Sequence, residues 1–101
     1  MDAAVTTSAE PAAAPTGTLR VVYFAWLRER VGRGEEEVTV SAGIATVADL
    51  LAVLRARSPA HALAFSNTSS VRCAVNQEFA APDAPVRPGD EVAFFPPVTG
   101  G

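Results

Sequence analysis

The pattern of apolar and polar positions becomes regular after the first eighteen residues and predicts a strand followed by a short helix. Residues 19–25 are rich in β-branched and aromatic side chains, which indicates a strand with one largely buried face. Leu27 and Val31 lie four residues apart with charged residues between them, the spacing of a short amphipathic helix. Gly32 follows directly and is the residue type at which helices commonly end.

The clearest helix signal in the chain begins at Thr46. Thr46 with Asp49 three residues later has the form of a capping box, and the helix is expected to end before Ser58–Pro59. Its apolar stripe has helical spacing and comprises Val47, Leu50, Leu51 and Leu54. Upstream of this helix, we interpret the glutamate run 35–37 as a solvated turn and expect a short strand over 38–40.

The second half of the chain predicts a further short helix and three strands. We expect a turn of helix over 60–65, and alternation over 71–75 indicates a half-buried strand. A tight turn at 76–77 leads into a short strand over 78–80. Residues 82–88 are too rich in proline for a regular strand.

The last predicted elements complete a mixed sheet. Residues 87–90 have the composition of a type II turn, a strand follows over 91–95, and two prolines stop it. The element order predicts an α+β fold in which one main helix packs on one face of the sheet. It is compatible with a β-grasp domain, whose first and last strands pair at the centre while the tail after Pro97 projects from the sheet.

The first eighteen residues differ from the rest of the chain. Residues 1–18 are rich in Ala, Thr and Pro and contain few large apolar side chains, so we expect a disordered extension. A helical arm or a docking tail is the alternative. A secretory signal is not expected, because the segment contains acidic residues and prolines but no basic residue. The predicted domain therefore spans 19–101.

Composition excludes several classes of function. The chain has 101 residues, a net charge of -3, one cysteine (Cys73) and one histidine (His61), so neither a disulfide framework nor a metal site is expected. All eight cations are arginines, and they are scattered, which argues against nucleic-acid binding. No apolar run approaches the ~18 residues of a membrane span. We expect a cytoplasmic protein.

The clearest candidate for chemistry is the end of the sequence, Val98-Thr99-Gly100-Gly101. After a proline-terminated strand, these residues would present the carboxylate of Gly101 on an arm with little side-chain bulk. Gly100 would give clearance, since glycine lets the backbone pass close to other atoms. An ordinary frayed terminus is the alternative. Activation of this carboxylate would need ATP and a second protein, because the chain has no phosphate-binding loop.

Alternation in the last strand assigns its side chains to two faces. With Val92 and Phe94 directed inward, Phe95 becomes the candidate for partner contact, joined by Pro97 and Val98 near the tail. The alternative is that both phenylalanines are structural.

Other reactive or aromatic side chains have structural interpretations that need no catalytic or binding role. Cys73 alternates with valines and is expected to pack as a small hydrophobe. His61 has no second ligand nearby in the sequence and is expected to be exposed. Tyr23 and Trp26 are expected in or near the core. Adjacent carboxylates at 90–91 would point to opposite faces and are not an acid/base pair.

Three segments resemble the MoaD family of ubiquitin-like sulfur carriers, the small subunits of molybdopterin synthase. The segments are 88–101, with its ending Phe-Phe-Pro-Pro-Val-Thr-Gly-Gly, 22–29 and 74–77. The resemblance implies a β-grasp fold. It also implies that the Gly101 carboxylate is adenylated and converted to a thiocarboxylate, which donates sulfur to a cyclic pterin precursor to form the dithiolene of molybdopterin.

The same resemblance implies the partners. A MoeB-type activating enzyme would consume ATP and magnesium, and a cysteine desulfurase or rhodanese-like protein would donate the sulfur. The large, MoaE-type subunit would supply the catalytic residues and accept the tail, including Thr99. No tightly bound cofactor is expected besides the covalent thiocarboxylate. The alternatives are a carrier for thiamine thiazole, cysteine or tRNA thiolation, a ubiquitin-like modifier, or a β-grasp interaction module whose terminus is inert.

Overall fold

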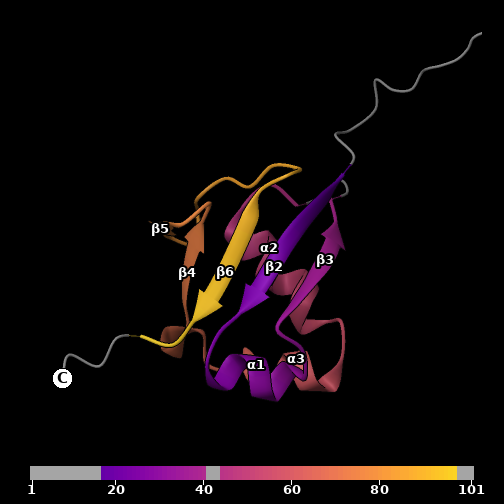
Figure 1. Ribbon diagram of the computed structural model, residues 1–101, viewed down its shortest axis with the longest axis vertical. Helices are drawn as coiled ribbons and strands as arrows, with labels where there is room; N and C mark the ends of the chain where they lie inside the picture. The colour runs from indigo at the N-terminus through magenta and orange to yellow at the C-terminus, as the bar shows by residue number, and fades with distance from the viewer. Residues whose placement is uncertain (1–16, 41–43, 98–101) are drawn as a thin grey trace, which may run out of the picture.

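The computed structural model describes residues 17–40 and 44–97 (Figure 1). The predicted extension 1–18 therefore lies outside the described residues except for Gly17 and Thr18, and Thr18 already belongs to the first strand. No helix within the two described ranges combines the length and hydrophobicity that crossing a bilayer requires.

The described residues form five strands, three α-helices and one 3-10 helix. The strands are β2 (Thr18–Tyr23), β3 (Glu35–Thr39), β4 (Arg72–Val75), β5 (Glu78–Ala80) and β6 (Glu91–Phe95). The helices are α1 (Trp26–Val31), α2 (Val47–Arg55), α3 (Pro59–Ala64) and η2 (Thr68–Ser70). All helices and strands expected from the sequence are present. β3 begins three residues earlier than predicted, so residues 35–37 belong to a strand and not to the expected solvated turn.

The strands form one mixed sheet in the order β3-β2-β6-β4-β5. The first and last strands, β2 and β6, pair in parallel at its centre, as predicted, and every other pair is antiparallel. Because β2 and β6 run the same way, the end of β6 lies beside the end of β2, where α1 begins (Figure 1). The residues that follow β6, as far as Pro97, leave the sheet on the side of β4 and β5 (Figure 1).

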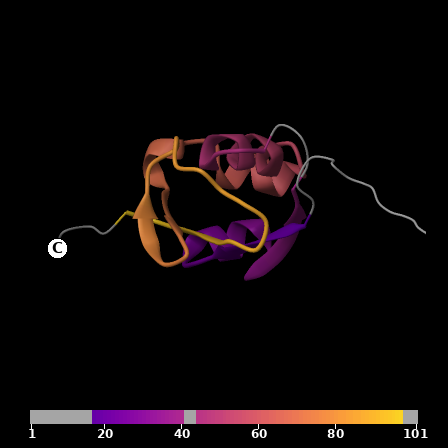
Figure 2. The same cartoon turned by 90° about the horizontal axis from the view of Figure 1, so that it is seen from above.

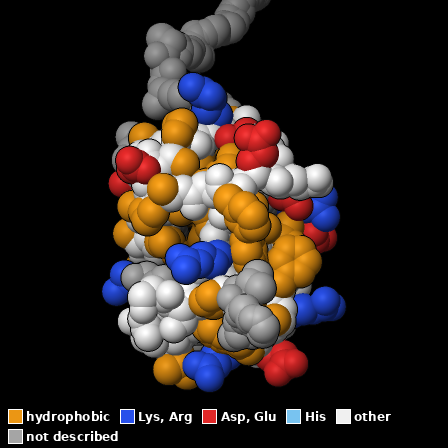
Figure 3. Space-filling view, turned by 90° about the vertical axis from the view of Figure 1, so that its left-hand side faces the viewer, with side chains coloured by type: hydrophobic (Ala, Val, Ile, Leu, Met, Phe, Trp, Pro, Cys, Tyr) orange, Lys and Arg blue, Asp and Glu red, His pale blue; other side chains and the backbone are white. Residues whose placement is uncertain are grey.

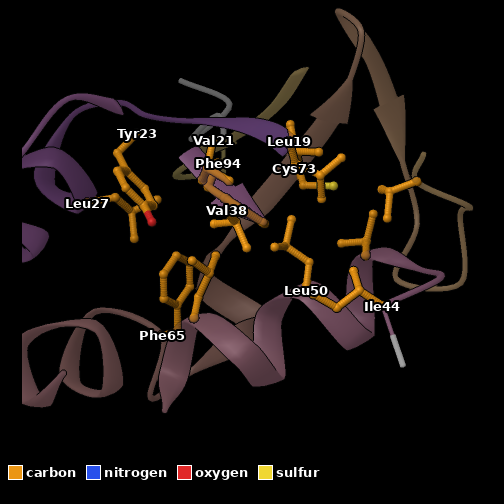
Figure 4. Packing of buried hydrophobic residues seen from close by; sticks show 14 of the residues in the cluster. Leu19, Val21, Tyr23, Leu27, Val38, Ile44, Leu50, Phe65, Cys73 and Phe94 are labelled. Carbon is orange, nitrogen blue, oxygen red and sulfur yellow. The ribbon is translucent and has the colours of Figure 1, made fainter. Parts of the chain in front are cut away.

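Helices α2 and α3 cover one face of this sheet, and α1 lies at its end (Figures 1 and 2). Among the described residues, no helix lies across the opposite face. The core lies between the sheet and these helices, and Figure 4 shows side chains from both layers meeting there. Its largest fully buried side chains are Tyr23, Phe65, Phe94, Leu19, Leu27, Leu50 and Leu54. Tyr23, Phe65 and Phe94 contact one another as an aromatic group, with ring centroids 5.2–6.4 Å apart.

Local sequence signals account for the ends of the helices. The Thr46 hydroxyl accepts a hydrogen bond from the Asp49 backbone N–H at 3.2 Å, and the Asp49 carboxylate accepts one from the Thr46 N–H at 3.1 Å. This reciprocal pair is the predicted capping box. Gly32 ends α1 with a φ of 94°, a left-handed conformation that glycine adopts without steric cost.

Two tight turns set the register of the last three strands. Asn76 and Gln77 both have positive φ, 50° and 71°, as a two-residue hairpin turn requires. Gly89 has a φ of 93°, and the Asp90 N–H donates to the Arg87 carbonyl at 3.0 Å. The second geometry fits the predicted type II turn, with glycine at the position that needs positive φ.

Candidate functional site

An aromatic patch lies on the uncovered side of the sheet, at the end where β6 finishes. We define the aromatic patch as Phe24, Phe79, Phe95 and Pro97. The Phe24 side chain is 50% exposed and that of Phe79 is 85% exposed, and the rings of Phe79 and Phe95 lie 5.9 Å apart. Viewed from the β5 side, hydrophobic side chains cover much of the visible surface (Figure 3).

Strand pairing explains why these side chains gather. Phe94 is fully buried whereas Phe95, its neighbour in β6, is half-buried on the other face, so the predicted assignment of the two phenylalanines to opposite faces is confirmed. The Phe24 N–H donates to the Phe94 carbonyl at 3.0 Å, which brings Phe24 to the same end of the sheet. Phe95 is also in register with Arg72 of β4.

Phe79 is the member of the patch that the sequence analysis did not single out. It occupies the middle of β5, where it is in register with Ala74, and it directs its ring to the open face. The sequence did contain a signal for Phe79. In the predicted strand 78–80, which follows a two-residue turn, the central side chain points to the opposite face of the sheet from its two neighbours. An aromatic side chain exposed to this degree on an edge strand is unusual for a structural residue.

A hollow of about 330 Å³ opens beside the patch. It is lined by Arg72, Cys73, Phe79, Ala80, Phe95 and Pro97. Pro97 is the last described residue, so this hollow lies at the base of the tail. The other predicted site residues, Val98, Thr99, Gly100 and Gly101, lie outside the described residues.

Charged side chains lie at the other end of the uncovered face. Arg20 of β2 is in register with Glu37 on one side and Glu91 on the other, and its Nε donates to the Glu35 carboxylate at 2.9 Å. This end of the face is therefore net acidic, with three carboxylates around one arginine. A partner bound across the sheet would meet aromatic side chains near the tail and acidic side chains farther away.

Cys73 packs as a core residue, as predicted. Its side chain is buried, and its Sγ lies 3.7 Å from the Ala80 carbonyl oxygen. Burial raises the pKa of the Cys73 thiol, which keeps it protonated and poorly nucleophilic. These properties argue against a role as a sulfur relay.

Two predictions about polar side chains were wrong, and for a shared reason. Glu36 does not lie in a solvated turn and His61 is not exposed: only 8% and 7% of their surfaces are accessible. Glu36 faces inward from β3, and its Oε2 lies 2.6 Å from the Nε2 of His61 in α3. The hydroxyl of Tyr23 donates to the same oxygen at 2.6 Å. Each polar group is buried because the others satisfy its hydrogen bonds.

The Ser58 hydroxyl extends this cluster, since its Oγ lies 2.7 Å from the Nδ1 of His61. Serine, histidine and glutamate in series resemble an arrangement that activates a nucleophile. Here, however, the Ser58 Oγ accepts a hydrogen bond from the His61 N–H at 3.1 Å as the cap of α3. The arrangement is therefore that of a helix cap.

Within the described part of the chain, no three His, Cys, Asp or Glu side chains come together as a metal site would need.

The sequence matches the model of the ThiS family over residues 21–101. The chain belongs to the ThiS family. It is 45% identical over 83 residues to the molybdopterin synthase sulfur carrier subunit of Escherichia coli (strain K12), and the alignment covers 82% of this chain and 99% of that relative. This membership confirms the family resemblance that the sequence analysis identified.

Solved structures of similar proteins confirm the β-grasp fold of this ThiS family member. A putative molybdopterin converting factor, subunit 1, from Pyrococcus furiosus superimposes with a TM-score of 0.68 at 32% identity, covering 81% of this chain and 99% of the other. The small archaeal modifier protein 1 of Haloferax volcanii superimposes with a TM-score of 0.65 at 32% identity, with the same coverage of 81% and 99%.

Proposed function

We propose that this chain is the sulfur-carrier subunit of a molybdopterin synthase. The observation that carries the proposal is the 45% identity to a molybdopterin synthase sulfur carrier subunit along 99% of that relative's length. The family match reaches Gly101 and so includes the Gly-Gly ending on which the chemistry depends.

In the proposed cycle the reactive group is the carboxylate of Gly101. A carboxylate is a poor electrophile, so an activating enzyme first joins it to the AMP portion of ATP, with magnesium, and releases pyrophosphate. The terminal sulfur of a persulfide on a donor protein then attacks the acyl carbon, and AMP leaves, so that an acyl disulfide joins the two proteins. A protein thiol next attacks the donor sulfur, forms a disulfide with it and breaks the bond between the two original sulfur atoms. The product is a thiocarboxylate, a sulfur nucleophile that stays attached to its carrier. Two such carriers supply the two sulfurs of one dithiolene.

The aromatic patch supports a docking role for the uncovered face. Large aromatic anchors contribute about 2 kcal/mol or more each when a partner buries them, and Phe95 and Phe79 are available for this at the base of the tail. Pro97 continues the patch toward Val98 and Thr99, which we propose enter the partner with the terminal glycines.

The relative from Escherichia coli is by its name one subunit of an enzyme, and we accordingly propose a second, large subunit as the acceptor of the tail. The catalytic side chains of the transfer would belong to that subunit. An adenylating enzyme and a sulfur donor act before it, and we place all of these steps in the cytoplasm.

The experiment is an intact-mass measurement on the chain after co-expression with an adenylating enzyme and a sulfur donor. We expect replacement of one oxygen by one sulfur in the full-length chain. The matched control lacks Gly101 and should show no gain. An unchanged mass of the full-length chain, with partners that thiolate another carrier in the same assay, would contradict the proposal.

The second candidate is a protein modifier, favoured by the 32% identity to small archaeal modifier protein 1. In that case the activated Gly101 would form amide bonds with lysines of other proteins. The chain itself has no lysine, so chains linked through its own side chains would not form. Carriers for other sulfur pathways share the first steps. Formation of molybdopterin when the thiocarboxylated chain is mixed with a synthase large subunit and pterin precursor distinguishes the first proposal from all of these.

A further inference from the structure

The buried cluster around Glu36 joins the helical layer to the sheet. We define the Glu36 cluster as Tyr23, Glu36, Ser58 and His61. The only hydrogen bond from α3 to a strand within the described residues is the one between His61 and Glu36, at 2.6 Å. Tyr23 reaches the same carboxylate oxygen from β2 at 2.6 Å, and Figure 4 shows its ring extending from the strand toward the helices.

Every charged or titratable group that faces the Glu36 carboxylate is a donor toward it. Tyr23 and His61 contact Oε2. Arg33, from the turn after α1, lies 3.4 Å from Oε1, and Arg57, after α2, lies 3.5 Å from it. The neighbouring glutamates of β3 lie on its exposed face. The site is therefore built for a carboxylate, which can only accept, and not for a carboxylic acid.

The cluster tolerates one added proton. When the imidazole is neutral with its proton on Nε2, the Ser58 hydroxyl donates to Nδ1. When Nδ1 is also protonated, it donates to the Ser58 Oγ, which lies at the same 2.7 Å. The serine hydroxyl reverses its role, and the hydrogen bond to Glu36 is kept in both states.

A second proton has no comparable place. Suppose that the imidazole is already charged and that Glu36 then takes up a proton. If the proton binds Oε1, the new O–H group faces the guanidinium groups of Arg33 and Arg57. If it binds Oε2, the charged His61 loses its counterion in a buried site. Either outcome removes the attraction that holds α3 on β3. The sheet is held separately, by the backbone ladders of β2 with β3 and β6.

We propose that the Glu36 cluster is an acid-sensitive latch, which holds helix α3 on the sheet and opens when Glu36 is protonated. The latch adjoins one member of the aromatic patch, because Tyr23 is followed in the chain by Phe24, whose side chain is exposed. Opening would loosen the support of that end of β2. The proposal is independent of the sulfur-carrier function.

The test is amide hydrogen exchange by NMR between neutral and acidic pH, expressed as protection factors. Ala62 and Phe65 report on α3, since their N–H groups donate to the carbonyls of Ser58 and His61. Arg20 and Asn76 report on the sheet, through bonds to Asp90 and Glu91. If opening takes up one proton, protection at the α3 sites falls by up to about tenfold per pH unit on the acidic side. The sheet sites should stay more strongly protected than the α3 sites over the same range, because they exchange only when the sheet itself opens.

Two substitutions test whether Glu36 causes the pH dependence of protection in α3. Glu36→Gln removes the titrating group and should abolish the pH dependence at Ala62 and Phe65. Glu37→Gln, its exposed neighbour on the same strand, is the matched control and should retain it. If Glu36→Gln does not fold, Tyr23→Phe serves instead: with one donor to the carboxylate removed, the loss of α3 protection should begin at a higher pH.

Three results would overturn the latch. The first is equal protection at the α3 sites and the sheet sites at every pH, which would mean that both exchange through global unfolding. The second is the absence of any pH dependence at the α3 sites. The third is an unchanged dependence in Glu36→Gln or, where that variant does not fold, in Tyr23→Phe.

Discussion

The neighbouring residues Phe94 and Phe95 of β6 should differ in what their truncation changes: Phe94→Ala should lower stability, and Phe95→Ala should weaken partner binding. Phe94 is fully buried, and its ring lies 5.2 Å from that of Phe65 and 6.4 Å from that of Tyr23. Removing a phenylalanine side chain from such a site costs about 3–5 kcal/mol. A domain of this size has a total stability of only about 4–12 kcal/mol, so Phe94→Ala should consume a large share of it.

The expected shift in melting temperature follows from the size of the domain. For 60–100 residues, 1 kcal/mol corresponds to about 4–8 °C, and Phe94→Ala should therefore lower the midpoint by about 12 °C or more. Phe95 is half-buried on the open face, and Phe95→Ala should cost below about 1 kcal/mol. Thermal and urea unfolding followed by circular dichroism measure both variants.

Binding should show the reverse order of sensitivity. In the proposed carrier, Phe95→Ala should weaken the complex with the synthase large subunit by about 2 kcal/mol, or about thirtyfold in Kd, as measured by calorimetry. Leu63→Ala is the matched control, because Leu63 is 61% exposed but lies on α3, on the helical side of the sheet. A large loss of stability in Phe95→Ala together with unchanged binding would refute the assignment of the two faces.

Three further predictions concern the fold. Thr46→Ala removes the hydroxyl that accepts a hydrogen bond from the Asp49 N–H and should lower the free energy of unfolding by about 1 kcal/mol. Thr46→Ser should restore most of this stability. Equal stability of the parent and both variants would contradict the capping role. Gly89→Ala should lower the free energy of unfolding by about 1 kcal/mol, because φ at residue 89 is 93°, which a residue with a Cβ adopts only at a cost. A clash would not contribute, since no atom lies within 4 Å of the added Cβ. A stability equal to that of the parent would mean that the turn changes conformation. Burial alone would raise the pKa of Glu36, but hydrogen bonds from Tyr23 and His61, with the nearby cations, outweigh it and lower the pKa below 4.5. The stabilisation by this carboxylate is therefore present above pH 4.5 and should be lost as the pH falls through the folded-state pKa; urea unfolding of the parent and of Glu36→Gln measures this, and parallel pH profiles would contradict it.

The elements that the sequence predicted well are those specified by neighbouring residues. The capping box at Thr46, the stop at Gly32 and the turn at Gly89 each depend on side chains or backbone within four positions, so a local pattern is sufficient. The central pairing of β2 with β6 was predicted on a different basis, because the order of the elements is compatible with a β-grasp domain, in which the first and last strands pair.

The aromatic patch could be predicted only in part. Alternation along β6 was enough to direct Phe95 outward, since that inference needs one strand and its period of two. Joining Phe24 and Phe79 to Phe95 requires the strand order, because Phe24 directly follows β2, Phe79 lies in β5, and both are distant in sequence from β6. Local patterns do not contain that information.

The two polar residues that were placed wrongly show where a sequence signal was available but overlooked. Glu36 is in phase with Val38 and Val40, two positions apart along a strand, and all three are buried. His61 is in phase with Ala64 and Phe65 at helical spacing, and these are buried too. A titratable residue in phase with the apolar positions of its element must be buried with them unless the element bends, and it then needs a partner of complementary chemistry. This chain has a single histidine, so the strongest candidate to accompany an inward glutamate was already identifiable. The distance between them still had to come from the fold, because 25 residues separate the two and only the packing of α3 against β3 brings them to 2.6 Å.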